Sequence, residues 1–314
     1  MIKKLDDNKT LHKILKYYYI DNITQQEIAD KLNISRIKVI RYINHAKENG
    51  LIEVKLNIPL KDSFELENRV ESAFNLKECR IVPSFSNENE IYKYAGADLA
   101  DLLKRLLKKD MYVGVSWSQT FRNVLEHTNP VKKMPLNVVP IIGGLELDGT
   151  TTNSNTIAHI FTEKAGGVSY TINIPAVFDS VEAKDIIENE WHTKKIKELA
   201  AKIELVITGV GDMGVEGTIF KSGYFKPAER NYLDSLKIAA IINLNFIDAK
   251  GEEVKTEIDK RIIKIFPLEM FKKLNKVIGI AFGKDKVNPV KAALNGRILK
   301  YLITDENTAK KLLE

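Results

Sequence analysis

The chain has 314 residues, 44% of them hydrophobic, and its single cysteine, Cys79, excludes a disulfide scaffold. The ordinary apolar fraction, with few Gly and Pro residues, excludes a largely disordered chain, and no apolar run in the sequence approaches the roughly 18–20 residues of a membrane span. We therefore expect a cytoplasmic protein of two domains, without a membrane partner.

The formal net charge of +6 is unevenly distributed along the chain. Residues 1–56 contain 11 Lys and Arg against 7 Asp and Glu, so about two thirds of the excess lies in less than a fifth of the sequence. A polyanion that binds this segment and a simple solvated basic face explain the asymmetry equally well on charge alone.

Residues 1–56 are predicted to form three helices. The first is indicated by apolar residues at helical spacing: Leu11, Ile14, Leu15 and Tyr18. The second begins at Thr24, whose spacing to Glu27 is that of a capping box, and ends near Leu32. Ser35 then caps a third helix that stops at Gly50. Two short helices joined by a tight turn make a helix-turn-helix, and a strand is expected over residues 51–58.

The third helix has a polar face suited to DNA. Arg36 and Lys38 occupy its first turn, where the helix dipole disfavours cations, so their placement favours an anion opposite. A recognition helix in a major groove presents its N-terminal residues in this way. Its other side is expected to pack on the first two helices through Ile37, Val39, Ile40 and Ile43. The candidate DNA-binding residues are Ser35, Arg36, Lys38, Arg41, Tyr42 and His45.

From about residue 77 onward, short apolar runs alternate with helical stretches. The predicted strands are Arg80–Val82, Tyr112–Val115, Val138–Ile142, Thr171–Ile174, Leu205–Val210, Ile238–Leu244, Val277–Ala281 and Ile298–Ile303. Long helical patterns cover Tyr92–Lys108 and Val181–Ala201. This alternation predicts an α/β fold, a mostly parallel sheet with helices on both faces.

One predicted strand-to-helix turn is suited to an anion. The strand Tyr112–Val115 leads into Ser116, Trp117 and Ser118, and a helix is expected from about Gln119. Backbone N–H groups and the positive end of the helix dipole would converge there, with hydroxyl donors beside them. An ordinary capped helix start has the same sequence features and is the better explanation of this turn taken alone; the family resemblance given next favours phosphate binding.

Five ordered segments, within about residues 10–314, carry a family resemblance: Gln25–Arg36, Gly114–Thr120, Pro140–Gly144, Ala281–Lys286 and Leu302–Asp305. Together they resemble the SorC/DeoR-type sugar-responsive bacterial transcriptional regulators. The resemblance implies a phosphosugar-isomerase-like effector domain that binds a phosphorylated sugar without converting it. It also implies a homo-oligomer, dimer or tetramer, and we expect a repressor that ligand releases from double-stranded operator DNA.

The resemblance assigns residues 1–56 to the DNA-binding domain and residues 57–314 to sugar-phosphate binding and oligomerisation. No catalytic residue and no cofactor is expected. The five histidines lack metal-ligand spacing, so no metal site is expected either. The implied effector-binding residues are Gly114, Ser116, Trp117, Ser118, Gln119, Thr120, Gly143, Gly144, Asn155, Gly211 and Lys286.

Two enzyme interpretations compete with this one. A phosphosugar isomerase with an added N-terminal domain would need an acid–base set of carboxylate and His, and the sequence shows no clear one. The segment Gly209–Gly214 matches the dinucleotide-binding pattern GxGxxG, but a glycine-rich stretch follows where that fingerprint requires a helix.

In the family a polar Gly-Asp pair is common where this chain has Ala240-Ile241, so no sugar preference carries over.

Overall fold

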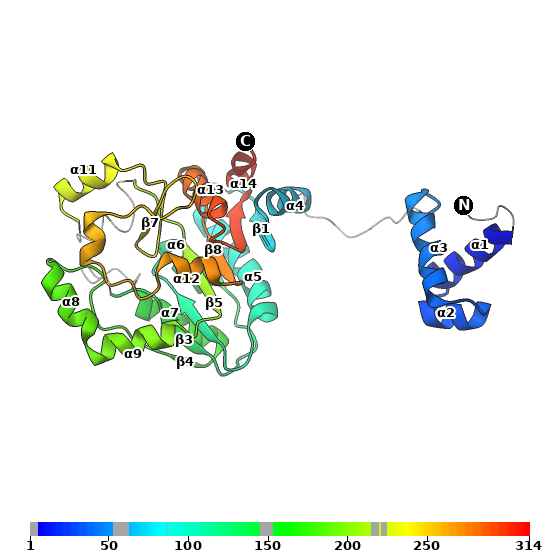
Figure 1. Cartoon of the computed structure of the whole chain (residues 1–314), viewed down its shortest axis with the longest axis horizontal. Helices are drawn as coiled ribbons and strands as arrows, with labels where there is room; N and C mark the ends of the chain where they lie inside the picture. The colour runs from blue at the N-terminus through cyan, green and yellow to red at the C-terminus, as the bar shows by residue number, and fades with distance from the viewer. Residues whose placement is uncertain (1–5, 53–62, 86, 145–152, 215–219, 221–224) are drawn as a thin grey trace. The chain divides into compact units, whose positions relative to one another are not determined.

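The computed structural model describes residues 6–52, 63–85, 87–144, 153–214, 220 and 225–314. The chain forms two compact units, Met1–Pro59 and Leu60–Glu314 (Figure 1). In the described part of the chain, no helix combines the length and the apolar character needed to cross a membrane.

The N-terminal unit contains the three predicted helices, α1 (Asp6–Tyr19), α2 (Gln25–Leu32) and α3 (Arg36–Glu48). Thr24 and Glu27 form the predicted capping box at the start of α2, and the Ser35 hydroxyl accepts a hydrogen bond from the Lys38 N–H. Between these helices, Asn33 takes a left-handed conformation with φ 51°, which makes the turn tight. Of the strand expected over residues 51–58, the positions 53–58 lie outside the described residues, and Leu51 and Ile52 are not in a strand.

The buried side of α3 differs from the prediction at two positions. The buried residues are spaced i, i+3, i+4 and i+7 from one another, and they are Val39, Tyr42, Ile43 and Ala46. This stripe leaves Ile37 outside, with 66% of its surface exposed, and brings Tyr42 into the core with 5% exposed. The assignment of Ile37 to the packed side and of Tyr42 to the polar face was therefore wrong, because Tyr42 follows Val39 by one helical turn.

The larger unit is built on a seven-stranded parallel sheet with strand order β1-β9-β8-β5-β2-β3-β4. Its strands are β1 (Glu78–Val82), β2 (Tyr112–Val115), β3 (Asn137–Pro140), β4 (Val168–Ser169), β5 (Leu205–Gly209), β8 (Val277–Ile280) and β9 (Tyr301–Asp305). The predicted α/β fold is confirmed. The predicted strand Thr171–Ile174 is not present; the strand in this part of the chain is the short edge strand β4, which comes before it.

The predicted strand Ile238–Leu244 is replaced by a separate antiparallel hairpin. It consists of β6 (Ala240–Ile242) and β7 (Asn245–Ile247), which pair outside the main sheet. The two linking residues, Asn243 and Leu244, both have positive φ, 52° and 58°. Positive φ at both positions is the geometry of a type I′ turn, which reverses the chain after β6.

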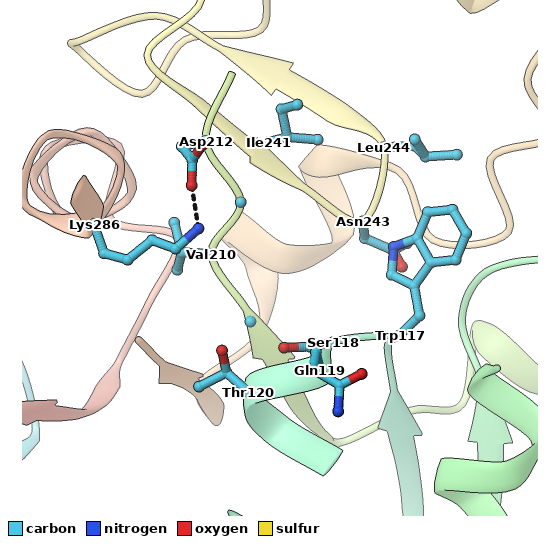
Figure 2. Close-up of a pocket in the computed structure, with 12 residues that line it drawn as sticks. Trp117, Ser118, Gln119, Thr120, Val210, Asp212, Ile241, Asn243, Leu244 and Lys286 are labelled. Atoms are coloured by element: carbon cyan, nitrogen blue, oxygen red, sulfur yellow. Dashed lines mark hydrogen bonds and ion pairs between the residues drawn. The ribbon is translucent and has the colours of Figure 1, made fainter. Parts of the chain in front are cut away.

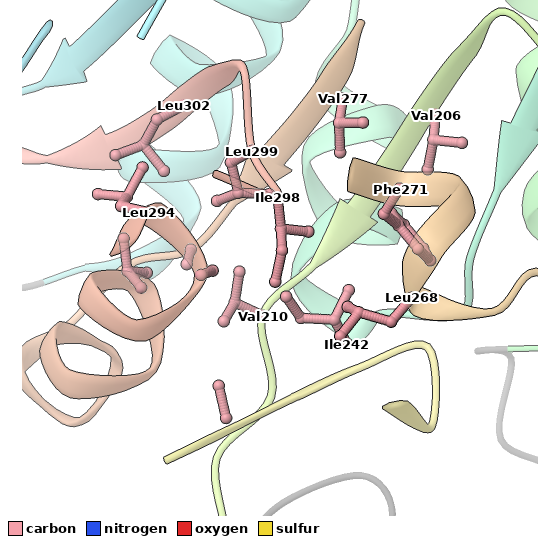
Figure 3. Close-up of a cluster of buried hydrophobic side chains, with 14 of the residues drawn as sticks. Val206, Val210, Ile242, Leu268, Phe271, Val277, Leu294, Ile298, Leu299 and Leu302 are labelled. Carbon is pink, nitrogen blue, oxygen red and sulfur yellow. The ribbon is translucent and has the colours of Figure 1, made fainter. Parts of the chain in front are cut away.

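Helices cover both faces of the parallel sheet. The core on one face is closed by α4 (Ser63–Phe74), α9 (Trp191–Ala200), α12 (Leu268–Lys273), α13 (Val287–Asn295) and α14 (Glu306–Leu312). Figure 3 shows part of it, with Val206 and Val277 of two strands near Phe271 of α12. The core on the other face is closed by α5 (Glu88–Leu106), α6 (Gln119–His127) and α7 (Ser154–Ala165).

The long helix predicted over Val181–Ala201 is two helices, α8 (Val181–Asn189) and α9. Glu190 between them has an extended backbone, with φ −63° and ψ 149°, and this conformation ends α8. The described unit also contains α11 (Pro227–Ser235) and two short 3₁₀ turns, η1 (Glu257–Arg261) and η2 (Lys284–Lys286).

Two carboxylates of α4 accept hydrogen bonds from backbone N–H groups of β1, the strand at the open edge of the sheet. The N–H of Ile81 donates to Glu67 at 2.9 Å, and the N–H of Cys79 donates to Glu71 at 2.7 Å. An edge strand otherwise leaves such donors for another chain. Burial raises the pKa of Glu67 and outweighs the lowering effect of the hydrogen bond from Ile81.

The variant Glu67→Gln is expected to raise the melting temperature at pH 7–8, since Gln keeps an acceptor for Ile81 without a half-buried charge. A carboxyl whose folded pKa is raised contributes stability below its unfolded pKa and loses it as pH rises. The gain should therefore shrink toward pH 4. Glu71→Gln is the matched control for charge loss, and a gain of Glu67→Gln that does not vary with pH would contradict this account.

Candidate functional site

The polar face of α3 is the candidate DNA interface. Ser35, Arg36, Lys38, Arg41 and His45 are all exposed, as predicted, whereas Tyr42 belongs to the core. Among the described residues, Arg36, Lys38 and Arg41 take part in no ion pair. Their charges are therefore available to phosphate or to base edges.

Two further features of this interface follow from the structure. The exposed Ile37 lies between Arg36 and Lys38 in the first turn, where an apolar side chain suits a thymine methyl group. His45 lies near the other end of α3, and its Nδ1 is 3.1 Å from the Asn49 amide nitrogen. The exposure of Ile37 could have been predicted from the i, i+3, i+4 stripe that starts at Val39.

The candidate effector site lies where the strand order of the sheet reverses. The neighbouring strands β2 and β5 lead the chain in opposite directions, β2 toward β3 and β5 toward β8. Ligands of open α/β sheets bind at such a switch point, beyond the carboxyl ends of the strands. A pocket there is open to solvent and has about 590 Å³ of empty space when the solvent at its mouth is included. It is lined by Trp117, Ser118, Gln119, Thr120, Gly209, Val210, Gly211, Asp212, Ile241, Asn243, Leu244 and Lys286 (Figure 2).

The start of α6 supplies hydrogen-bond donors to this pocket. The Ser118 hydroxyl caps the helix by accepting from the Phe121 N–H at 3.1 Å. The next two N–H groups, of Gln119 and Thr120, precede the first intrahelical hydrogen bonds and have no acceptor within the described residues. Gly209 is the close neighbour of this cap, because a Cβ there would lie 2.2 Å from Ser118 Oγ.

Lys286 meets Asp212 in the pocket. Its Nζ donates to Asp212 Oδ2, and both side chains are largely buried, with 25% and 22% of their surfaces exposed. Burial raises the pKa of Asp212, but the hydrogen bond and charge of Lys286, with the N–H of Gly214, outweigh it and lower that pKa. Of the described residues that line the pocket, these two are the charged ones, so their charges cancel.

The opposite wall is formed by Trp117 and the β6–β7 hairpin (Figure 2). Asn243 of the hairpin turn is anchored by three side-chain hydrogen bonds. Its Oδ1 accepts from Ser116 Oγ at 2.9 Å, and its Nδ2 donates to the carbonyls of Ile141 at 3.0 Å and Phe266 at 3.4 Å. Ser116 is buried behind the pocket and fixes this wall. Ile241 gives the wall an apolar side chain.

Five predicted effector residues do not line this pocket, and the buried Ser116 described above is one of them. Gly114 lies within β2, and the close approach of Ile141 and Val206 leaves no room for a side chain there. Gly143 packs against the main chain of Ile174 and Pro175, and its neighbour Gly144 forms an isolated parallel β-bridge with Pro175. Asn155 uses its amide on the main chain of Ile172, donating at 3.0 Å and accepting at 2.9 Å. All five, Ser116 included, have structural contacts in place of pocket contacts.

The sequence reasoning missed Asp212 and Asn243 as pocket residues. Asp212 lies inside the motif Gly209–Gly214, of which only Gly211 is among the expected effector-binding residues. In the described part of that motif, up to Gly214, no helix begins, and residues 215–219 lie outside the described residues. Gly211 does line the pocket, and its main chain pairs with Ile241 at 2.9 and 3.0 Å.

Lys286 and Thr120 also line a second, larger groove at the carboxyl ends of β1, β8 and β9. Phe282 lies in this groove, with its ring centroid 6.3 Å from that of Tyr92. Within the described residues, no cluster of His, Cys, Asp and Glu is arranged to hold a metal ion.

Comparison with known proteins matches both units. The family described as "Putative sugar-binding domain" matches residues 58–314, and the family described as winged helix-turn-helix DNA-binding matches residues 7–53. The deoxyribonucleoside regulator of Bacillus subtilis is 28% identical over 303 residues, which is 95% of each chain. The sorbitol operon regulator of Klebsiella pneumoniae is 27% identical, over 98% of this chain and 99% of the relative.

The solved structures agree with these matches. The crystal structure of the full-length sorbitol operon regulator SorC from Klebsiella pneumoniae superposes with a TM-score of 0.75 at 26% identity, covering 99% of this chain and all of that one. The similarity therefore includes the helix-turn-helix as well as the sheet domain. This chain belongs to the SorC/DeoR-type family of sugar-responsive, DNA-binding transcriptional regulators.

Proposed function

We propose that this regulator is a repressor whose effector is a phosphorylated sugar. Residues 1–56 bind operator DNA through α3, and residues 57–314 bind the effector in the pocket between β2 and β5. The effector weakens DNA binding and so releases the operator. The relatives are named as regulators of deoxyribonucleoside and sorbitol genes, and the chain is a regulator, not an enzyme.

The observation that carries the phosphate proposal is the meeting of Lys286 with the start of α6 in one pocket. The free N–H groups of Gln119 and Thr120 lie at the positive end of a nine-residue helix, a common phosphate site in α/β proteins. Lys286 adds a point charge, and the hydroxyls of Ser118 and Thr120 add donors. Trp117 and Asn243 are placed to contact the sugar.

A homo-oligomer follows from the proposed operator binding. Helix-turn-helix proteins read symmetric half-sites as dimers, with one α3 equivalent in each half-site. We propose that residues 57–314 also form the contacts between copies, as a dimer or a tetramer. A protein that binds chromosomal operators works in the compartment that holds the DNA, so the proposed function implies a cytoplasmic protein.

A thermal-shift panel tests the phosphate. A phosphorylated sugar at about 100 times its Kd should stabilise the unit by about 2.7 kcal/mol, which raises the melting temperature by about 5–10 °C. The unphosphorylated sugar should raise it much less. Lys286→Ala should remove most of the difference, whereas the exposed neighbour Lys284, which does not line this pocket, supplies the control Lys284→Ala. Equal shifts from both sugars would contradict a phosphate site.

A further inference from the structure

The pocket assigned to the effector phosphate already contains an anion. Lys286, which would receive the phosphate, donates its hydrogen bond to the Asp212 carboxylate (Figure 2). An arriving phosphate would meet a Lys286 whose charge is neutralised and a carboxylate that repels it. The inference below rests on the proposed function and concerns the consequence of this pairing.

The contacts that fix the backbone around Asp212 do not depend on its ion pair with Lys286, so the carboxylate can separate from Lys286 without unfolding of this segment. The Gly211 main chain is fixed to Ile241 by two hydrogen bonds, at 2.9 and 3.0 Å. The carboxylate Oδ1 accepts from the Gly214 N–H at 2.6 Å, on the side away from the Oδ2 that Lys286 contacts. A side-chain rotation can therefore separate Asp212 from Lys286 while the backbone keeps its contacts with β6.

We propose that Asp212 is an internal competitor for the effector's anionic group and sets which anions the pocket accepts. A ligand carboxylate that displaced Asp212 would replace one carboxylate on Lys286 by another and gain nothing there. A phosphate dianion brings a larger charge and three acceptor oxygens, so it reaches Lys286 and the N–H groups of Gln119 and Thr120 together. Asp212 thus lowers affinity for all anions and excludes sugar acids in favour of sugar phosphates.

The test compares the full-length chain with Asp212→Asn, using inorganic phosphate and glucuronate as probes in calorimetric titrations. Asn keeps an acceptor for Gly214 and removes the charge that competes for Lys286. Hydrogen bonds to charged groups are typically worth a factor of about 10–150 in affinity, so the Kd for phosphate should fall by at least about tenfold. Glucuronate binding is expected to be barely detectable with wild type and to become measurable with Asp212→Asn.

Two further variants make the result specific. Asp285→Asn also removes one negative charge beside Lys286, but Asp285 is exposed and does not line this pocket, so both Kd values should change less than about twofold. In a Lys286→Met background, Asp212→Asn should bring a clearly smaller gain, because only the direct repulsion by Asp212 is then removed and no Lys286 is freed. Circular dichroism checks that each variant is folded.

The outcomes separate the two claims. If wild type binds phosphate and Asp212→Asn binds it equally or more weakly, Asp212 contacts the ligand favourably and the competitor inference is wrong, while the proposed phosphate effector stands. If neither wild type nor Asp212→Asn binds phosphate, and the chain binds unphosphorylated sugars alone, both the inference and the proposed function fail.

Discussion

An alanine in place of Arg41 is expected to weaken operator binding by about 5- to 150-fold, or about 1–3 kcal/mol, if Arg41 reads a base. The same holds for Lys38, which lies one turn earlier on the exposed face of α3 and forms no ion pair with a described residue. A base-reading residue should also lose discrimination at one operator position. A phosphate contact should instead weaken all sequences alike and reduce the salt slope by about one.

Fluorescence anisotropy on a duplex selected from a random pool by the full-length protein measures these effects at several salt concentrations. Lys47→Ala is the matched control, because Lys47 is an exposed cation of α3 in its last turn, away from the N-terminal residues that enter the groove. Unchanged affinity and salt slope for both Lys38→Ala and Arg41→Ala, with the fold intact by circular dichroism, would overturn the assignment of α3.

The parts of the fold that follow local rules could be predicted from the sequence. The capping box at Thr24, the Ser35 cap and most core strands were predicted, because caps and hydrophobic periodicity are local signals. The β6–β7 hairpin was not, since the strand signal of Ile238–Leu244 does not show that Asn243 and Leu244 turn the chain back. The division of Val181–Ala201 at Glu190 likewise depends on packing rather than on apolar spacing.

In the candidate site, too, some features follow from the local sequence and others depend on tertiary structure. The turn before α6 shows the features of an anion site because strand, turn and helix are consecutive in the sequence, but only the family resemblance favours a phosphate there. The pairing of Lys286 with Asp212 joins residues 74 positions apart, and the Ser116–Asn243 bond joins residues 127 positions apart, so tertiary structure alone reveals them. Asn155 and Gly143 were predicted from the resemblance, and the contacts that they make are structural.

Binding of the effector is expected to lower the affinity for the operator, and binding of the operator to lower the affinity for the effector. Coupling between two sites requires that ligand bias a conformational or oligomeric state that the DNA also biases, and it typically amounts to about 1–3 kcal/mol. Saturating sugar phosphate should therefore lower operator affinity by about 5- to 150-fold. Lys286→Ala should retain full operator affinity but lose the response to ligand.

A paired titration tests the central claim that one chain links sugar to DNA. The sugar phosphate with the largest thermal shift is titrated by calorimetry into the free protein and into its complex with the selected duplex, at one salt concentration. Linkage requires the duplex to change ligand affinity by the factor by which ligand changes duplex affinity, so the account predicts a Kd about 5- to 150-fold higher in the complex. Equal Kd values in the two titrations would show that the units are uncoupled and would contradict it.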